Sequence, residues 1–474
     1  MTKVPLKLSG GFYQARSLIA NQQRCVNLYP ERNAEDSPFP FTMYQTPGLG
    51  VLVAGNGEPG RGLYPSTDGK LFLVSGQRVY YIDGSFNATL LGTLTADIST
   101  PVCMQDNGID LVIVDGTTGG KIVNLSTLVM TNYSDPNFLG ADYVGYLDTF
   151  LVFNQPGTRN FYNTLSNSTT IDPLDIAAKT GYPDNIASLI VMHLDIWLLG
   201  SQKSTEIWNN VGGLFPFARQ PGIFIEHGCV AKYSVAKHDL IIFWLGLDAD
   251  GTSTVFMGSN YQAKKISTPA IAAEFGKYSV VSDAIGFVYK QIDHIFYFLT
   301  FPTANKTWVF DLSEGLWHER SWLDVNGVEN RHRAMAGAVC YNRNVCLDWE
   351  NGTLYEFDLE KYTDNASPIK RTRSFPHVVS NGSRITHSSF IADMMCGQLT
   401  PDDPAQVSLR WSDDRGMTFG NPVVQLLGST GDYLKQPKWS QLGLARDRVY
   451  ELSWSADVNT ALNGAYLDAT PGAT

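Results

Sequence analysis

The feature of this 474-residue sequence that most constrains its fold is a strand-turn-strand unit that returns seven times. Each copy is an apolar run of strand length, a polar or glycine-containing turn, and a second strand rich in β-branched and aromatic residues. A hairpin of this kind cannot bury its two faces alone, and a spacing of roughly 40–50 residues is typical of propeller blades. The repeat therefore predicts a propeller-like body of about seven blades. The units are LFLVSGQRVYYID from Leu71, DLVIVDGTTGGKIVN from Asp110, TFLVFNQPGTRNFYNT from Thr149, IWLLGSQKSTEIWNN from Ile196, LIIFWLGLDADGTSTVFMG from Leu240, HIFYFLTFPTANKTWVFDL from His294 and NVCLDWENGTLYEFD from Asn344.

Composition supports an all-β fold. Aromatic residues make up 12% of the chain and charged residues only 17%, with 43 glycines and 23 prolines, a balance that favours short strands and turns over long charged helices. Two short helices are expected between strand units. One lies within residues 267–276, where a threonine precedes a proline and a glycine follows. The other is a single turn within residues 172–178.

The two ends of the chain do not share the repeat. Residues 406–412 and 448–454 alternate between apolar and polar side chains, as strands with one buried face do. We therefore divide the chain into an N-terminal arm and closing segment (1–60), a β-propeller-like domain (61–372) and a C-terminal β-sandwich domain (373–474).

One Asp-box occurs, outside the predicted blades. It follows the pattern S-x-D-x-G-x-T-[FW] and consists of Ser412, Asp414, Gly416, Thr418 and Phe419. In sugar-cleaving propellers this hairpin recurs from blade to blade, whereas here it is present once. We expect it to be a structural turn in which the aspartate accepts backbone N–H groups while the aromatic ring packs beneath.

Charge and motifs exclude several classes of function. A formal net charge of −11 disfavours a protein that wraps nucleic acid, because neutralising phosphates needs clustered lysine and arginine. We predict no catalytic, cofactor-binding or metal-binding residues, since nucleophile-elbow, phosphate-loop and zinc-protease motifs are missing and the eight histidines are scattered.

The six cysteines lack metal-site spacing, and the N-terminus has no apolar stretch typical of a signal peptide, so synthesis in a reducing cytoplasm is expected.

Basic residues are the candidate contacts with other proteins. Arg16 and Arg24 flank an apolar step in the N-terminal arm, and Lys370, Arg371 and Arg373 form the one compact cluster of positive charge at the junction of the two domains. In an acidic chain such residues suit an acidic partner or DNA, although a solvated linker or pairing with carboxylates of the same chain would explain them equally well.

Several segments, in their order and spacing, resemble the packaged-DNA stabilisation proteins of short-tailed phages. The likeness extends over most of the chain and is carried by ARSLIANQQRCVNLYPE (15–31), YQTPGLG (44–50), IWLLGSQKSTEIWNN (196–210), PGIFIEHGCVAKYSV (221–235), GSNYQAKKISTPAIA (258–272), LRWSDDRGMTFG (409–420) and RVYELSW (448–454).

The resemblance implies a structural virion protein: a tail hub, or head-completion protein, that joins below the portal and its adaptor ring and seals packaged DNA in the head. It implies a homo-hexamer, partners that include the adaptor ring, a tail needle or plug and tailspikes, and double-stranded DNA passing without sequence-specific binding. The protein would be made in the host cytoplasm and placed in the virion tail, with no cofactor and no enzymatic activity. The alternative is a glycan-binding or glycan-cleaving propeller, similar to sialidases, which the Asp-box motivates.

Overall fold

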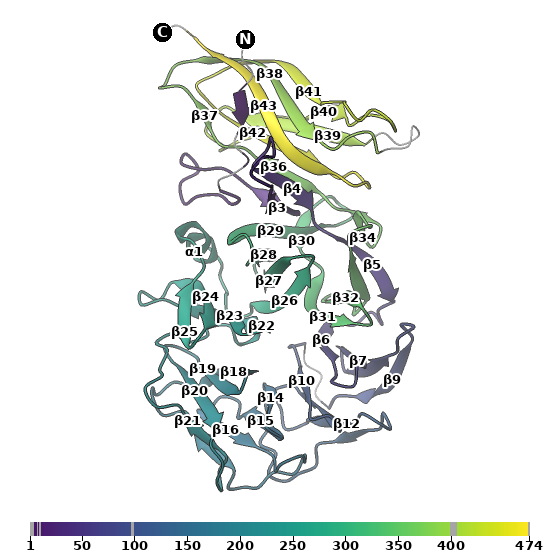
Figure 1. The fold of residues 1–474 in the computed structure, drawn as a ribbon, viewed down its shortest axis with the longest axis vertical. Coiled ribbons are helices and arrows are strands. Elements are labelled where there is room, and N and C mark those ends of the chain that lie inside the picture. Colours follow the sequence, from purple (N-terminus) through teal and green to yellow (C-terminus); the bar gives the residue numbers. More distant parts are fainter. Residues whose placement is uncertain (1–3, 7, 9–10, 96–98, 399–404, 473–474) are drawn as a thin grey trace.

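The chain forms a ring of β-sheets with a β-sandwich above it (Figure 1). The computed structural model describes residues 4–6, 8, 11–95, 99–398 and 405–472. Around the ring stand seven four-stranded antiparallel blades, which confirms both the all-β fold and the number of blades that the repeat predicts. Each repeat unit supplies the two middle strands of one blade.

The first four blades follow the chain in order. Blade 1 consists of β6 (Gly60–Pro65), β7 (Leu71–Ser75), β8 (Arg78–Ile82) and β9 (Ala88–Thr93). Blade 2 consists of β10 (Cys103–Asp106), β11 (Asp110–Val114), β12 (Lys121–Asn124) and β13 (Met130–Asn132). Blade 3 consists of β14 (Val144–Leu147), β15 (Phe150–Asn154), β16 (Asn160–Asn163) and β17 (Ile176–Ala178). Blade 4 consists of β18 (Ile186–Met192), β19 (Asp195–Gly200), β20 (Thr205–Asn210) and β21 (Phe217–Arg219).

The last three blades include the helical segments and the closure of the ring. Blade 5 follows the 3₁₀ turn η1 (Lys232–Ser234) and consists of β22 (Ala236–His238), β23 (Ile241–Leu247), β24 (Ser253–Ser259) and β25 (Gln262–Lys265). Helix α1 (Pro269–Phe275) leads to blade 6, with β26 (Ile285–Gln291), β27 (His294–Phe301), β28 (Lys306–Asp311), β29 (Leu316–Leu323) and the appended β30 (Glu329–Arg331). Blade 7 consists of β31 (Ala334–Cys340), β32 (Arg343–Asp348), β33 (Leu354–Asp358) and, from the N-terminal region, β5 (Gly48–Val53); the short strands β34 (Thr363–Asp364) and β35 (Ser367–Pro368) extend its sheet.

The second strands of the blades read as continuous apolar runs because both faces of each blade are covered. In β7, Leu71 and Leu73 pack toward blade 7, whereas Phe72 and Val74 pack toward blade 2. In β11, Leu111 again packs toward blade 1. Seven separate clusters of buried side chains fill the seven gaps between neighbouring blades. Each blade is therefore held on both faces by its neighbours rather than by a common core.

One of the two predicted helices is present. Helix α1 begins after Thr268, whose side chain accepts a hydrogen bond from the N–H of Ile271 at 3.4 Å, and has Pro269 in its first turn. The predicted turn of helix at 172–178 is wrong. Residues Ile176–Ala178 instead form β17 and pair with β16, because the third blade needs a fourth strand to cover its edge.

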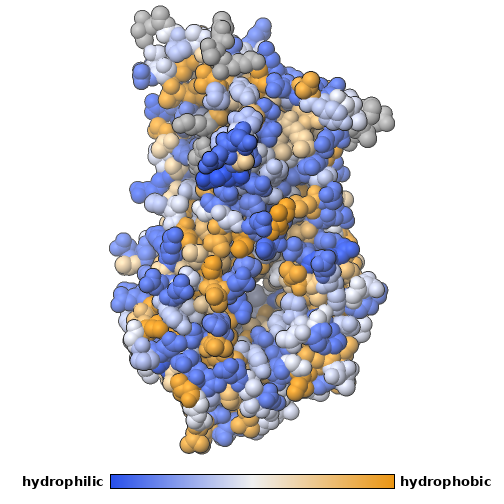
Figure 2. All heavy atoms as spheres, viewed as in Figure 1, coloured by the Kyte–Doolittle hydropathy of each residue, from blue (hydrophilic) through white to orange (hydrophobic). Residues whose placement is uncertain are grey.

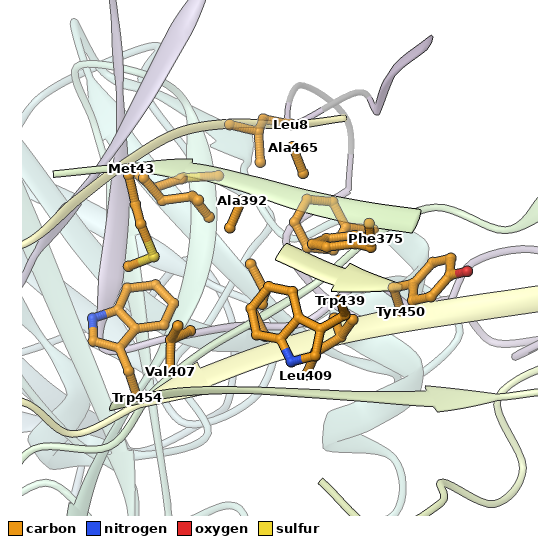
Figure 3. Close-up of a cluster of buried hydrophobic side chains, with 14 of the residues drawn as sticks. Leu8, Met43, Phe375, Ala392, Val407, Leu409, Trp439, Tyr450, Trp454 and Ala465 are labelled. Atoms are coloured by element: carbon orange, nitrogen blue, oxygen red, sulfur yellow. The ribbon is translucent and has the colours of Figure 1, made fainter. Parts of the chain in front are cut away.

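The sandwich combines both ends of the chain. One of its sheets runs in the order β3 (Leu28–Arg32), β4 (Phe41–Gln45), β43 (Ala461–Pro471), β38 (Ile385–Met394) and β41 (Lys438–Ala445), with β1 (Val4–Leu6) also paired to β43. The other sheet contains β36 (Arg371–Ser374), β42 (Asp447–Trp454), β39 (Gln406–Ser412) and β40 (Val423–Leu426), with β37 (Val378–Val379) paired to β42. Figure 3 shows Phe375, Leu409, Trp439, Tyr450 and Trp454 meeting between the sheets, where all five are buried.

Ring closure depends on Gly48 at the start of β5. An added Cβ at this position would lie 2.5 Å from the carbonyl oxygen of Thr363 and 2.6 Å from that of Lys361. Backbone atoms cannot move away without displacing β34, so we expect Gly48→Ala to lower the free energy of unfolding by about 1–3 kcal/mol. Urea unfolding measures this loss, and Val51→Ala, at a half-exposed position of the same strand, is the matched control with a loss below about 1 kcal/mol. Equal stability of Gly48→Ala and the wild type would show that β5 is not seated tightly in blade 7.

Candidate interaction site at the joint between propeller and sandwich

The two-residue strand β2 (Cys25–Val26) joins the propeller to the sandwich. Val26 pairs in parallel with Glu319 of β29, and Cys25 and Val26 pair antiparallel with Arg373 and Thr372 of β36. Blade 6 and one sheet of the sandwich therefore form a single hydrogen-bonded sheet of eleven strands, which is visible in Figure 1 as the stack that leads from β26 upward to β40. Four of the five candidate basic residues, Arg24, Lys370, Arg371 and Arg373, lie at this joint.

Asn27 locks the joint immediately after β2. It adopts a positive φ of 54°, and its side chain is almost completely buried. Its amide Nδ2 donates to the carbonyl oxygen of Lys370 at 2.8 Å and to Ser321 Oγ at 3.1 Å, while its Oδ1 accepts from the N–H of Ser321 at 2.9 Å. A single side chain thus satisfies backbone groups of both domains.

Arg24 forms ion pairs within its own chain. Its guanidinium contacts Glu319 in a bidentate fashion at 3.0 and 2.9 Å and lies 3.6 Å from Glu329. Burial alone would lower the pKa of Arg24, but the charges of Glu319 and Glu329 outweigh it and raise this pKa. Lys370 Nζ donates to Glu329 Oε1 at 2.7 Å. Burial acts to raise the pKa of Glu329, but Lys370 and Arg24 lower it.

The predicted basic cluster at the junction is not an exposed patch. Arg371 and Arg373 are fully buried, since β36 is a central strand whose two faces are both covered. Arg373 Nη2 donates to the carbonyl oxygen of Leu8 and to Gln23 Oε1, both at 2.8 Å. Arg371 Nη1 and Nη2 donate to the carbonyl oxygens of Ala456 at 3.0 Å and Tyr362 at 3.2 Å. Burial lowers the pKa of each guanidinium to about 10, so both stay charged at neutral pH and hold the arm and loops in place.

Arg16 differs from these residues because its side chain is exposed. It lies in the turn between Ala15 and Asn21, which is closed by a hydrogen bond from the N–H of Ala15 to the carbonyl oxygen of Asn21 at 2.9 Å. No ion pair involves Arg16 within the described part of the chain. Of the five candidate contact residues, Arg16 is therefore exposed, Lys370 is partly exposed, and Arg24, Arg371 and Arg373 are occupied inside the joint.

The Asp-box forms a self-contained turn between β39 and β40. Asp414 Oδ1 accepts hydrogen bonds from Ser412 Oγ at 2.6 Å and from the N–H of Thr418 at 2.8 Å, and its Oδ2 accepts from Thr418 Oγ1 at 2.6 Å. These bonds from Ser412 and Thr418 lower the pKa of Asp414 to about 2. The Phe419 ring lies under the guanidinium of Arg410 at 4.8 Å.

The N-terminal arm passes directly behind this turn. Gly416 has a φ of 86°, and a Cβ there would lie 2.5 Å from Gln22 Cγ. Gln22 Nε2 donates to the carbonyl oxygen of Gly416 at 3.0 Å. The oxygens of Asp414 are thus committed to the turn, and the turn itself anchors the arm.

Sequence reasoning missed Asn27 and Glu319, which build the joint, and the buried charged residues Arg320 and Asp364 of the propeller. One signal was present: the run His318-Glu319-Arg320 interrupts an otherwise apolar strand. Such a charged run inside a buried strand indicates a polar interior contact.

Within the described residues no group of three or more His, Cys, Asp and Glu side chains could hold a metal ion, and no helix there is long and apolar enough to cross a membrane. All six cysteines are free thiols.

Asp364 makes the stability of the joint depend on pH. Its side chain is buried, and burial raises its pKa to about 7, against the opposing charges of Arg371, Arg320 and Arg333. The folded state therefore keeps a proton that the unfolded chain releases near the ordinary aspartate pKa of 3.8, so this group costs stability progressively as the pH rises from about 4 to about 7. We expect Asp364→Asn to match the wild type near pH 4 and to be more stable at pH 8 by on the order of a few kcal/mol.

Urea unfolding at the two pH values measures this difference, and Asp250→Asn, the same substitution at an exposed turn position, is the matched control. An Asp364→Asn variant less stable than the wild type at pH 8 would show that the ionised carboxylate is the stabilising form.

Asp414→Ala tests whether the Asp-box is structural. Loss of its three bonds to Ser412 and Thr418 leaves backbone groups that water can reach, so the melting temperature is expected to fall by only about 2 °C. Thr430→Ala, at an exposed position in the next loop, is the control. We expect no turnover of fluorogenic sialosides or other glycosides by either variant or the wild type. Glycoside cleavage that disappears in Asp414→Ala would contradict a structural role.

Comparison with known proteins agrees with this two-domain architecture. A family model described as "Bacteriophage P22 Gp10, beta-propeller" matches residues 2–362, and a second described as "Bacteriophage P22 Gp10, beta-sandwich" matches residues 370–470. No curated protein matches the sequence significantly.

Similar solved structures are remote in sequence. They include the N-terminal domain of Nup159 (9% identity, covering 70% of this chain and 98% of that one, TM-score 0.42). The Pan2 WD40 domain of Neurospora crassa has 8% identity to this chain, and the match covers 63% of this chain and 89% of that one with a TM-score of 0.39. The computationally designed Ika8 protein has 12% identity, and the match covers 65% of this chain and 99% of that one with a TM-score of 0.37. Similarities this remote carry no information about function. The two family models span nearly the whole chain, and the chain therefore belongs to the bacteriophage P22 Gp10 family of head-completion, packaged-DNA-stabilising structural proteins.

Proposed function

We propose that this phage structural protein is a tail hub, which attaches below the portal and its adaptor ring after packaging, seals DNA in the head and later forms part of the ejection conduit. Copies of the chain would form a homo-hexameric tube. Its other partners would be a tail needle or plug and the tailspikes, and double-stranded DNA would pass through without sequence-specific contacts. The protein would act without a cofactor and without catalysis.

The observation that carries this proposal is the continuous sheet through β2. A seal must resist the outward push of a stiff, self-repelling duplex, and a flexible link between two domains would yield to it. Here Val26 and Asn27 bridge the domains through main-chain and side-chain hydrogen bonds, and the Arg24–Glu319 pair lies beside them. Each subunit can then act as one stiff body in the wall of a ring.

Charge also supports a conduit. The net charge of −11 gives phosphates little to bind, and a channel wall that held phosphates tightly would slow ejection. Two basic residues remain candidate contacts with an acidic adaptor: Arg16, which is exposed in the arm, and Lys370, which is partly exposed. The glycan-processing alternative loses its main motivation, because the carboxylate of the single Asp-box is occupied within its own turn.

Removal of the gene tests the hub function. In a wild-type particle, many weak contacts repeated around a symmetric ring must break together before the channel can open. Phage grown without the gene lack this ring and should therefore package DNA and then lose the DNA. Nuclease-protected DNA per particle measures the loss, and electron microscopy should show emptied heads that lack a tail tip.

Add-back of purified protein provides the control. It should preserve DNA in heads that are still filled and restore nothing to heads already empty. Stable, DNA-filled particles that fail to adsorb would instead indicate a receptor-binding or glycan-processing component.

A further inference from the structure

An apolar knob projects from one end of the sandwich. In the loop between β40 and β41, Tyr433 is 69% exposed and Leu434 is 98% exposed. The loop is structured: the N–H of Lys435 donates to the carbonyl oxygen of Asp432, that of Asp432 to Ser429, and that of Gly431 to Gly397, at 3.0 to 3.1 Å. The turn thus holds two neighbouring large apolar side chains in water, and burying the leucine alone against a partner would be worth about 1.5–3 kcal/mol.

An apolar groove lies in the first sheet of the same domain. It has a volume of about 380 Å³ and is lined by the rings of Phe39, Phe41 and Tyr466, by Pro5 and Pro38, and by Gly464. A Cβ on Gly464 would lie 2.9 Å from the Phe39 ring. The glycine therefore lets this ring lie close against β43, and the groove is a built feature of the strand rather than a gap in packing.

The knob and the groove are different surfaces of the domain. The strand order is β3-β4-β43-β38-β41, and β1 pairs with β43 on the same edge as β4. The groove is formed by β1, β4 and the middle strand β43, whereas the knob precedes the edge strand β41. A contact between two different surfaces of identical copies is head-to-tail, and such contacts can close into a ring.

Charges beside the two surfaces are complementary. Lys435 and Lys438 follow the knob in sequence, and Glu35 and Asp36 precede the groove residues Pro38 and Phe39. All four charged side chains are exposed, and none of them takes part in an ion pair within the described residues. In an acidic chain, two adjacent lysines without carboxylate partners are suited to a carboxylate pair on another copy.

We propose that Tyr433 and Leu434 of one copy dock into the groove formed by Phe39, Phe41 and Tyr466 of the next copy, with Lys435 and Lys438 facing Glu35 and Asp36. This contact rests on the proposed ring-forming hub and names the surfaces through which its subunits associate. The aromatic groove supplies the buried centre of the interface, and the four charges form its rim.

Charge reversal with rescue is the first test, measured by sedimentation velocity and native mass spectrometry on the full chain. Reversing the knob (Lys435→Glu with Lys438→Glu) or the groove (Glu35→Lys with Asp36→Lys) should weaken assembly, and mixing the two variants should restore it in alternating pairs. Leu434→Glu should raise the concentration of half-assembly by about tenfold or more. Leu214→Glu, at a fully exposed leucine of blade 4, is the matched control and should change nothing.

Cysteine cross-linking is the second test. A chain carrying Leu434→Cys and Pro38→Cys should give a ladder of linked copies on mild oxidation, whereas either substitution alone should give none. Dimers from Leu434→Cys alone would show a two-fold contact and overturn the proposal. A wild-type chain that stays monomeric at its highest soluble concentration would overturn it as well.

The two proposals can fail separately. If the wild type assembles and preserves DNA while the knob and groove variants assemble equally well, the hub function stands and this interface is wrong. If assembly depends on the knob and groove but the added protein never preserves DNA in filled heads, the interface stands and the hub function is wrong.

Discussion

Mutual burial of neighbouring blades is the constraint on which the rest of this structure depends. Apolar residues of one strand pack alternately against two different blades, as Leu71 and Phe72 do in β7. A blade with an absent neighbour would expose a whole apolar face, so the ring is stable only when it is closed. Closure is achieved by β5 from the N-terminal region, which pairs with β33 of blade 7. The segment that precedes this strand contributes β1, β3 and β4 to the sandwich and β2 to the joint.

The same N-terminal region unites the two domains. Its strands β1, β3 and β4, which precede β5 in the chain, belong to one sheet of the sandwich, and β2 joins blade 6 to the other sheet. Two arginines then secure it: the fully buried Arg373 binds carbonyl oxygens of the arm, and the partly buried Arg24 pairs with Glu319 of blade 6. These charges serve cohesion within the chain.

The periodic parts of the fold could be predicted from the sequence, whereas the parts built by distant segments could not. Apolar hairpins such as the unit from Leu71 show the middle strands of all seven blades, and the alternation at 406–412 shows a sandwich strand, because local pattern and burial coincide there. The fourth strands of blades 2 to 5 have only three or four residues, too few to show a pattern. Ile176–Ala178 resembled a turn of helix in sequence, and only its pairing with β16 makes it a strand. Lys370, Arg371 and Arg373 looked alike in sequence, yet whether each side chain is buried depends on β2 and β42 on either side of β36.

The order of synthesis gives β2 and β5 a further significance. Both strands leave the ribosome early, but their partners β33 and β36 lie some three hundred residues later in the chain, and loop closure over such separations is slow. Strands β2 and β5 therefore stay without these partners until β33 and β36 have been synthesised, whereas β3 and β4 can pair with each other early. A truncated product would lack both a closed ring and a finished joint, so only complete chains would reach a shape able to enter a particle.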